Sequence, residues 1–136
     1  MNADQLAAQL TIDEGKRRRI YADTAGKQTV GVGRNMTDRD LSDDEIGLML
    51  KNDIAMVCSQ LDKAAPWWKS LSERRKQALA NFVFNVGIAT ALTFKNTMQL
   101  MQSGQYTAAA DEMMRSKWAG QVGARAHRIT TMIREG

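Results

Sequence analysis

A capping box at Ser42 divides the sequence into two parts of different character. In Ser42-Asp-Asp-Glu45, a serine precedes a glutamate by three residues, the pattern in which each side chain accepts a hydrogen bond from the other residue's backbone N–H at a helix start. The sequence after the box reads as helices, whereas the sequence before it contains a short helix and strand-like runs. We predict an α+β fold, mostly α, in which a small N-terminal β-hairpin lobe (residues 11–41) is joined by a long helix to a helical lobe (residues 42–136).

The N-terminal part is predicted to form one helix and one hairpin. Residues 4–14 place two leucines near helical spacing, and we expect helix 1–14 to pack at the junction of the two lobes. Residues 18–21 and 28–32 are strand-like. They flank the turn 23–26, which ends in a glycine that can supply a positive φ. These features predict an antiparallel hairpin directly after the first helix.

The C-terminal part is predicted to be a series of helices. Ser72 is expected to cap a helix that contains the most apolar segment, residues 78–86. We predict this helix to be central and buried, and to end at Gly87. The other predicted helices span residues 42–61, 88–93, 96–103, 106–116 and 123–134.

Charge and cysteine content narrow the classes of function. The 136 residues carry a net charge of +4, which suggests a polyanionic partner such as nucleic acid, a membrane or the bacterial cell wall. One His and one Cys cannot build a standard zinc site, so no metal is expected. The single Cys58 also excludes an intrachain disulfide. No signal peptide and no membrane-spanning apolar run is visible, so we expect synthesis in the cytoplasm.

Three side chains in the N-terminal part suggest acid–base chemistry. Glu14 lies in the last turn of the first predicted helix, where the negative end of the helix dipole disfavours a second negative charge, as suits a general acid. Asp23 lies in the hairpin turn and is expected to stay ionised. Thr29, on the returning strand, can hydrogen-bond a water near Asp23. Two carboxyl groups in different environments suit the hydrolysis of a glycosidic bond, although such groups also occur on ordinary surfaces.

Several motifs follow one another along nearly the whole chain. They are Ile12-Asp-Glu-Gly15, Ile20-Tyr-x-Asp23-Thr24, Thr29-x-Gly-x-Gly33, Leu41-Ser-x-x-Glu45, Ala80-Asn-Phe-Val-Phe-Asn-Val-Gly87, Ser116-Lys-Trp118 and Arg125-Ala-His-Arg-Ile-Thr-Thr131. Together, and in this order, they resemble the T-even phage lysozyme family, glycoside hydrolase family 24. The resemblance implies a phage lysozyme-like fold, a single lysozyme domain over residues 1–136 and an active site between two lobes.

The resemblance also implies an activity. The family cleaves the β-1,4 bond between N-acetylmuramic acid and N-acetylglucosamine in bacterial peptidoglycan, without a cofactor. By resemblance, Glu14 is the general acid, and Asp23 is the base that activates water with Thr29. Peptidoglycan is then the partner of a monomer, with no nucleic acid and no stable membrane anchor. We expect the protein to act on the cell wall after release from the host cytoplasm, during phage-mediated lysis.

Further positions match the family's substrate-binding residues. Phe84 and Asn85 match the cleft wall, where the Asn amide could bind a sugar. Ser116 and Lys117 match a cleft-lining Ser-Arg pair, although Lys117 lacks the bidentate geometry of arginine. Arg125 matches the arginine that pairs with the acid glutamate.

Two features depart from the family pattern. Arg34 stands where the family often has a histidine, so its role in substrate binding rests on position alone. The stretch from Gly33 to Ser42 leaves little room for a third strand. A smaller N-terminal lobe would give a more open cleft.

Three other interpretations remain open. A lytic transglycosylase needs the glutamate but no water-activating carboxylate, so the pair Asp23 and Thr29 argues against it. A basic helical nucleic-acid-binding protein would use a surface such as Lys16–Arg19 and predicts salt-dependent DNA binding without wall hydrolysis. Such a run is more typical of a solvated face, and near an anionic wall it would aid encounter. A wall-binding module without catalysis is disfavoured by the intact carboxylates.

Overall fold

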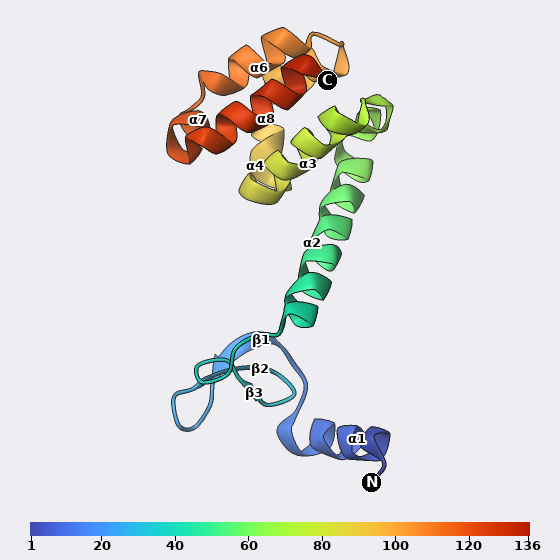
Figure 1. The fold of residues 1–136 in the computed structure, drawn as a ribbon, viewed down its shortest axis with the longest axis vertical. Helices are drawn as coiled ribbons and strands as arrows, with labels where there is room; N and C mark the ends of the chain where they lie inside the picture. Colours follow the sequence, from blue (N-terminus) through green and yellow to red (C-terminus); the bar gives the residue numbers. More distant parts are fainter. The chain divides into compact units, whose positions relative to one another are not determined.

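The computed structural model describes residues 1–136 and contains eight α-helices, one 3-10 helix and one three-stranded antiparallel sheet (Figure 1). The predicted α+β architecture, mostly helical, is therefore confirmed. The chain divides into two compact units, residues 1–48 and 49–136. The predicted packing of helix 1–14 at a lobe junction concerns both units and stays a prediction.

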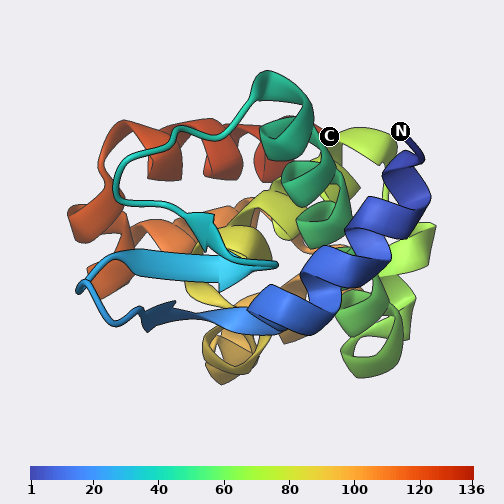
Figure 2. The same ribbon diagram turned by 90° about the horizontal axis from the view of Figure 1, so that it is seen from below.

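The first unit contains one helix and a small sheet. Its elements are α1 (Ala3–Glu14), β1 (Arg17–Ala22), β2 (Gln28–Gly31) and β3 (Arg34–Asn35). The strands pair in the order β1-β2-β3, and β1 and β2 run side by side in Figure 2. The expectation that there was little room for a third strand was wrong, because two residues suffice: Thr29 pairs with Asn35 and Val30 with Arg34. Three residues, 31–33, close this second hairpin.

The first strand contains a bulge. Arg17 pairs with Gly31 and Tyr21 with Thr29, so four steps along β1 lie opposite two steps along β2. A bulge leaves its extra residues unpaired and turns their side chains away from the regular ladder. Here it falls on Arg18, Arg19 and Ile20, which are all exposed.

Helix α2 (Asp43–Ala64) begins at the predicted capping box. The backbone N–H of Ser42 donates to Glu45 Oε2 at 2.9 Å, and that of Glu45 donates to Ser42 Oγ at 3.2 Å. The helix begins in the first unit and continues into the second. It ends three residues later than predicted, since Pro66 disfavours the helical conformation only for the residue directly before it.

The second unit is entirely helical. After α2 it contains a 3-10 helix, η1 (Pro66–Ser70), and then α3 (Glu73–Val86), α4 (Ile88–Thr93), α5 (Lys95–Gln102), α6 (Tyr106–Met114), α7 (Lys117–Val122) and α8 (Ala124–Glu135). Ser72 caps α3 as predicted, accepting a hydrogen bond from the backbone N–H of Arg75 at 3.2 Å. Helix α8 packs against α3 and α6 (Figure 1). None of the helices combines the length and apolar character needed to cross a bilayer.

Helix α7 was not anticipated. The predicted helix 106–116 ends at Met114, and a separate helix begins after Ser116, which caps it by accepting from the backbone N–H of Ala119 at 3.4 Å. The Ser116 hydroxyl also donates to the carbonyl of Met113 at 2.6 Å. Ser116 thus bonds to the end of one helix and caps the start of the next. The break between the two helices is too short to interrupt the pattern of apolar residues in the sequence.

The buried hydrophobic residues all lie in the second unit, between Val57 and Ile133. At their centre Phe82 is fully buried, and its ring meets those of Phe94 and Trp118 edge to face, each with centroids 4.9 Å apart. Edge-to-face contacts of this kind add to the stabilisation from burial. The prediction that α3 is central and buried holds for one face of the helix, formed by Ala78, Leu79, Phe82 and Val83, whereas its other face is exposed.

Candidate active site

Asp23 is held in the hairpin turn through one of its two carboxylate oxygens. Its Oδ1 accepts hydrogen bonds from the backbone N–H of Ala25 at 2.9 Å and of Lys27 at 2.8 Å. The backbone N–H of Asp23 in turn donates to the carbonyl of Lys27 at 2.9 Å. This Asx-type turn is a local preference of aspartate, so the sequence itself orients the side chain. Oδ2 takes no hydrogen bond and is the oxygen left to accept a proton.

Thr29 is the one fully buried residue of the first unit, with 3 % of its surface exposed. Its hydroxyl donates to the carbonyl of Lys27 at 3.0 Å. A hydroxyl that has committed its proton keeps its lone pairs as acceptors. Thr29 therefore offers an acceptor in a fixed direction. Asp23 and Thr29 thus both hydrogen-bond to the backbone of Lys27.

Glu14 is the last residue of α1, and Gly15 follows it with a φ of 76°. The Gly15 N–H donates to the carbonyl of Thr11 at 3.1 Å, which ends the helix at the predicted residue. The Glu14 side chain is exposed and lies against Gly33, in the connection between β2 and β3. Within the first unit no hydrogen bond or ion pair holds its carboxyl group. That group is therefore available to a substrate.

Arg34 is engaged by the start of α2. Its guanidinium group pairs with the carboxylate of Glu45. The Arg34 hydrogen bond, followed by that from the Ser42 backbone, lowers the pKa of Glu45 from 4.5 to about 2. Arg34 thus ties β3 to the capping box, and its predicted part in substrate binding stays a prediction.

Three predicted residues of the second unit lie near the ends of α3 and α7. The Asn85 Oδ1 accepts a hydrogen bond from Trp118 Nε1 at 2.8 Å, so its amide oxygen joins α3 to α7 and only its NH₂ group remains for a ligand. Ser116 is occupied as the cap of α7. Lys117 is exposed and forms no ion pair. The structure therefore gives Asn85 and Ser116 structural contacts that the motif match did not predict.

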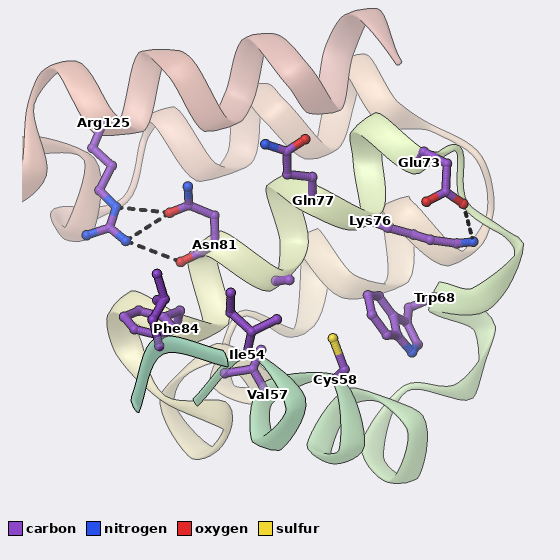
Figure 3. Close-up of a pocket in the computed structure, with 12 residues that line it drawn as sticks. Ile54, Val57, Cys58, Trp68, Glu73, Lys76, Gln77, Asn81, Phe84 and Arg125 are labelled. Atoms are coloured by element: carbon purple, nitrogen blue, oxygen red, sulfur yellow. Dashed lines mark hydrogen bonds and ion pairs between the residues drawn. The ribbon is translucent and has the colours of Figure 1, made fainter. Parts of the chain in front are cut away.

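Phe84 and Arg125 line an apolar groove of the second unit with a volume of about 550 Å³ (Figure 3). Phe84 is 46 % exposed. The Arg125 Nε donates to Asn81 Oδ1 at 3.1 Å and its Nη2 to the same atom at 2.8 Å. The other lining residues come from α2, η1 and α3: Leu50, Ile54, Val57, Cys58, Trp68, Glu73, Lys76, Gln77, Ala80 and Asn81.

Sequence reasoning missed Asn81, the partner of Arg125. A usable signal exists: Gln77, Asn81 and Asn85 recur every four residues along α3, so they form one polar stripe beside the apolar residues of 78–86. Cys58 lines the same groove and is only partly buried. The expected pairing of Arg125 with Glu14 joins residues of different units and stays a prediction.

No three His, Cys, Asp or Glu side chains gather closely enough to hold a metal ion. The chemistry that the first unit offers is therefore that of carboxyl and hydroxyl groups on an exposed helix end and a hairpin turn.

Comparison with known proteins identifies the family of the chain. The family model described as phage lysozyme matches residues 11–131. The chain is 27 % identical to the probable T4-type lysozyme 1 of Dictyostelium discoideum, over 93 % of this chain and 92 % of that protein. It is 32 % identical to the SAR-endolysin of Escherichia phage Mu, over 77 % of this chain and 65 % of that protein. It is 24 % identical to the pre-baseplate central spike protein Gp5 of Enterobacteria phage T4, over 96 % of this chain and 28 % of that protein.

The matched residues include Glu14, Asp23 and Thr29, and the matching region covers most of both units. A family match of this extent, over a fold with the predicted small sheet and helices, settles the classification. The chain belongs to the phage lysozyme family of glycosidase-type cell-wall hydrolases.

Proposed function

We propose that this protein is a muramidase that hydrolyses the β-1,4 bond between N-acetylmuramic acid and N-acetylglucosamine in bacterial peptidoglycan. Its role would be wall degradation and host lysis by a phage. It would act as a monomer, without a cofactor and without nucleic acid, and would reach the wall after release from the host cytoplasm. Family membership and relatives whose names are lysozyme and endolysin support the proposal.

In the proposed mechanism Glu14 donates its proton to the glycosidic oxygen as the bond to the anomeric carbon breaks. A water molecule attacks the anomeric carbon and gives a proton to Asp23 Oδ2. Thr29 accepts a hydrogen bond from the second hydrogen of that water and so aims its lone pair. General acid–base assistance of this kind contributes about a hundredfold to ten-thousandfold in rate.

One observation supports the assignment of the base: only one of the two carboxylate oxygens of Asp23 is hydrogen-bonded. Oδ1 is used by the backbone of the turn, and Oδ2 is free. Thr29 has committed its proton to the Lys27 carbonyl, so only its lone pairs are left for a water. A water between them would donate one hydrogen to each. This leaves the water oxygen's lone pairs for the anomeric carbon.

Among the predicted substrate-binding residues of the second unit, Phe84 and Arg125 are the best placed. Phe84 offers an exposed aromatic face and Arg125 a fixed cation in the same groove. We propose that they contact the glycan strand. Lys117 and the free amide NH₂ of Asn85 are proposed as weaker contacts, together with Arg34, whose guanidinium is already paired.

Asp23→Asn tests the base while preserving the turn. The asparagine Oδ1 can accept the same two backbone hydrogen bonds, so only the free oxygen is replaced by an amide NH₂. We expect hydrolysis of purified peptidoglycan to fall by at least about a hundredfold. Thr29→Ala should also lose activity. Thr24→Ala is the matched control, since Thr24 is an exposed hydroxyl of the same turn and forms no hydrogen bond.

The products distinguish this chemistry from that of a transglycosylase. Mass spectrometry of wild-type digests should show muropeptides with reducing ends. Release of 1,6-anhydro ends, or full activity of Asp23→Asn, would contradict a water-activating base. Because the water attacks directly in this mechanism, the anomeric configuration of the first product should be inverted.

A further inference from the structure

Gly33 occupies a position where a side chain would collide with Glu14. A Cβ placed on Gly33 would lie 2.8 Å from Glu14 Oε2, 2.9 Å from its Cδ and 3.0 Å from its Cγ. These distances are well inside the ordinary contact distance of about 3.5 Å for nonbonded heavy atoms. The carboxyl group of Glu14 therefore fills the space that any other residue at position 33 would need.

Gly33 is the neighbour against which the Glu14 side chain lies within its unit. No hydrogen bond or ion pair in the first unit holds the carboxyl group, and the residue is exposed at the end of α1. An exposed glutamate without partners samples several rotamers. The bare backbone at Gly33 provides a surface against which one of them can rest.

The connection that carries Gly33 is itself fixed. Val30 and Arg34 pair across the β2–β3 hairpin on either side of it. Arg34 is further tied to the α2 capping box through its ion pair with Glu45. The backbone of Gly33 is thus anchored on both sides.

We propose that Gly33 is a positioning residue for the general acid. Because Gly33 has no side chain, the Glu14 carboxyl group can lie against its backbone, and this contact fixes the carboxyl group beside the hairpin. The proposal rests on the proposed role of Glu14. Gly33 itself transfers no proton and acts only through the glutamate. A positioned acid matters because a displacement of about 1 Å can cost about a hundredfold in rate.

The chain contains a matched control two residues away. Gly31 and Gly33 both have positive φ, 69° and 65°, in the same short connection. A Cβ on Gly31 would meet nothing within 4 Å, whereas one on Gly33 meets Glu14. Alanine at either position therefore imposes the same kind of backbone strain, but only at position 33 does it displace the glutamate.

The experiment compares Gly31→Ala with Gly33→Ala in the full chain. Both should lower the thermal unfolding midpoint by similar amounts. Gly33→Ala should lower kcat on purified peptidoglycan by about a hundredfold, with little change in KM, while Gly31→Ala keeps most of its activity. The alkaline limb of the pH–rate profile, which reports the general acid, should shift in Gly33→Ala alone.

Asparagine variants keep the test usable if alanine prevents folding. Asn tolerates positive φ better than Ala, so Gly31→Asn and Gly33→Asn should fold, and only the second still places a Cβ against Glu14. Equal losses of activity at positions 31 and 33 would mean that backbone strain explains the effect and would overturn the proposal. Full activity of Gly33→Ala or Gly33→Asn would overturn it as well.

Glu14→Gln separates this proposal from the function on which it rests. If Glu14→Gln were inactive and Gly33→Ala were active, Glu14 would remain the general acid, but the positioning role of Gly33 would be refuted. A fully active Glu14→Gln would instead refute the acid, and any loss in Gly33→Ala would then be purely structural.

Discussion

The two units of the chain differ in the interactions that stabilise each of them internally. The second unit, residues 49–136, contains all the buried hydrophobic residues, which pack around Phe82. The first unit buries only Thr29 fully and is organised by short-range polar contacts. Examples are the Asp23 turn and the bonds of Asn35 with Thr37 and Asp38, at 2.8 to 3.1 Å.

This difference suggests that the residues that determine the stability of the protein and those proposed for catalysis lie in different units. Large stability changes come from creating cavities in a core, and such a core lies in the second unit. The proposed acid and base lie in the first unit, where polar groups set directions rather than fill volume. We therefore expect substitutions to divide into those that unfold the protein and those that inactivate it while it stays folded. Four predictions test this division.

The largest effect is expected in the second unit. Phe82→Ala removes a ring that is 0 % exposed and contacts two other aromatic rings, so we expect the free energy of unfolding to fall by about 3–5 kcal/mol. Denaturant titration measures the loss. Phe84→Ala, two residues along the same helix and 46 % exposed, should cost much less. Equal losses would mean that the core does not carry the stability of this unit.

Glu14→Gln should inactivate without unfolding. The amide keeps the size of the side chain but has no proton to transfer, so we expect lysis of walls to fall by at least about a hundredfold. The thermal midpoint should stay near that of the wild type. Asp13→Asn, which changes the neighbouring exposed carboxylate, is the matched control. A Glu14→Gln variant that clears turbid wall suspensions at the normal rate would remove the basis of the proposed mechanism.

Glu45 links the stability of the first unit to acid pH. Its pKa is lowered from 4.5 to about 2 by Arg34 and Ser42, so its stabilising effect is fully present above about pH 4.5 and is lost as the pH falls toward 2. Glu45→Gln should therefore be less stable than the wild type at pH 6, and the difference should vanish near pH 2. Thermal melts across this range test the effect. Asp44→Asn, an adjacent acid without an ion pair, should show a smaller pH dependence.

The smallest effect concerns the basic bulge of β1. Lys16–Arg19 are exposed and form no ion pair, so they should speed encounter with an anionic wall. Replacing Arg18 and Arg19 by Gln should slow lysis of whole cells at low salt. The difference should disappear well above about 0.15 M salt, where the screening length is below roughly 8 Å. Cleavage of a small neutral chitooligosaccharide should not change, and the double variant Lys63→Gln/Arg128→Gln, which also removes two exposed positive charges, controls for net charge. Equal effects on both substrates would exclude electrostatic steering.

Local signals in the sequence predicted most of the elements. The Ser42–Glu45 capping box, the Ser72 cap and the stop at Gly15 all involve groups within four residues of each other, so chain chemistry alone specifies them. The Asp23 turn belongs to the same class. The motif match likewise identified the family, because family motifs are themselves strings of residues.

Contacts between distant residues decided the rest. Trp118 reaches Asn85 across 33 positions, Arg125 reaches Asn81 across 44, and Glu14 meets Gly33. The bulge in β1, where four residue steps lie opposite two steps of β2, likewise depends on the pairing of the two strands. A sequence shows which residues are present, which of them can cap a helix and which of them can form a turn. Which side chain fills the space left by another depends on packing, and packing exists only once the chain has folded.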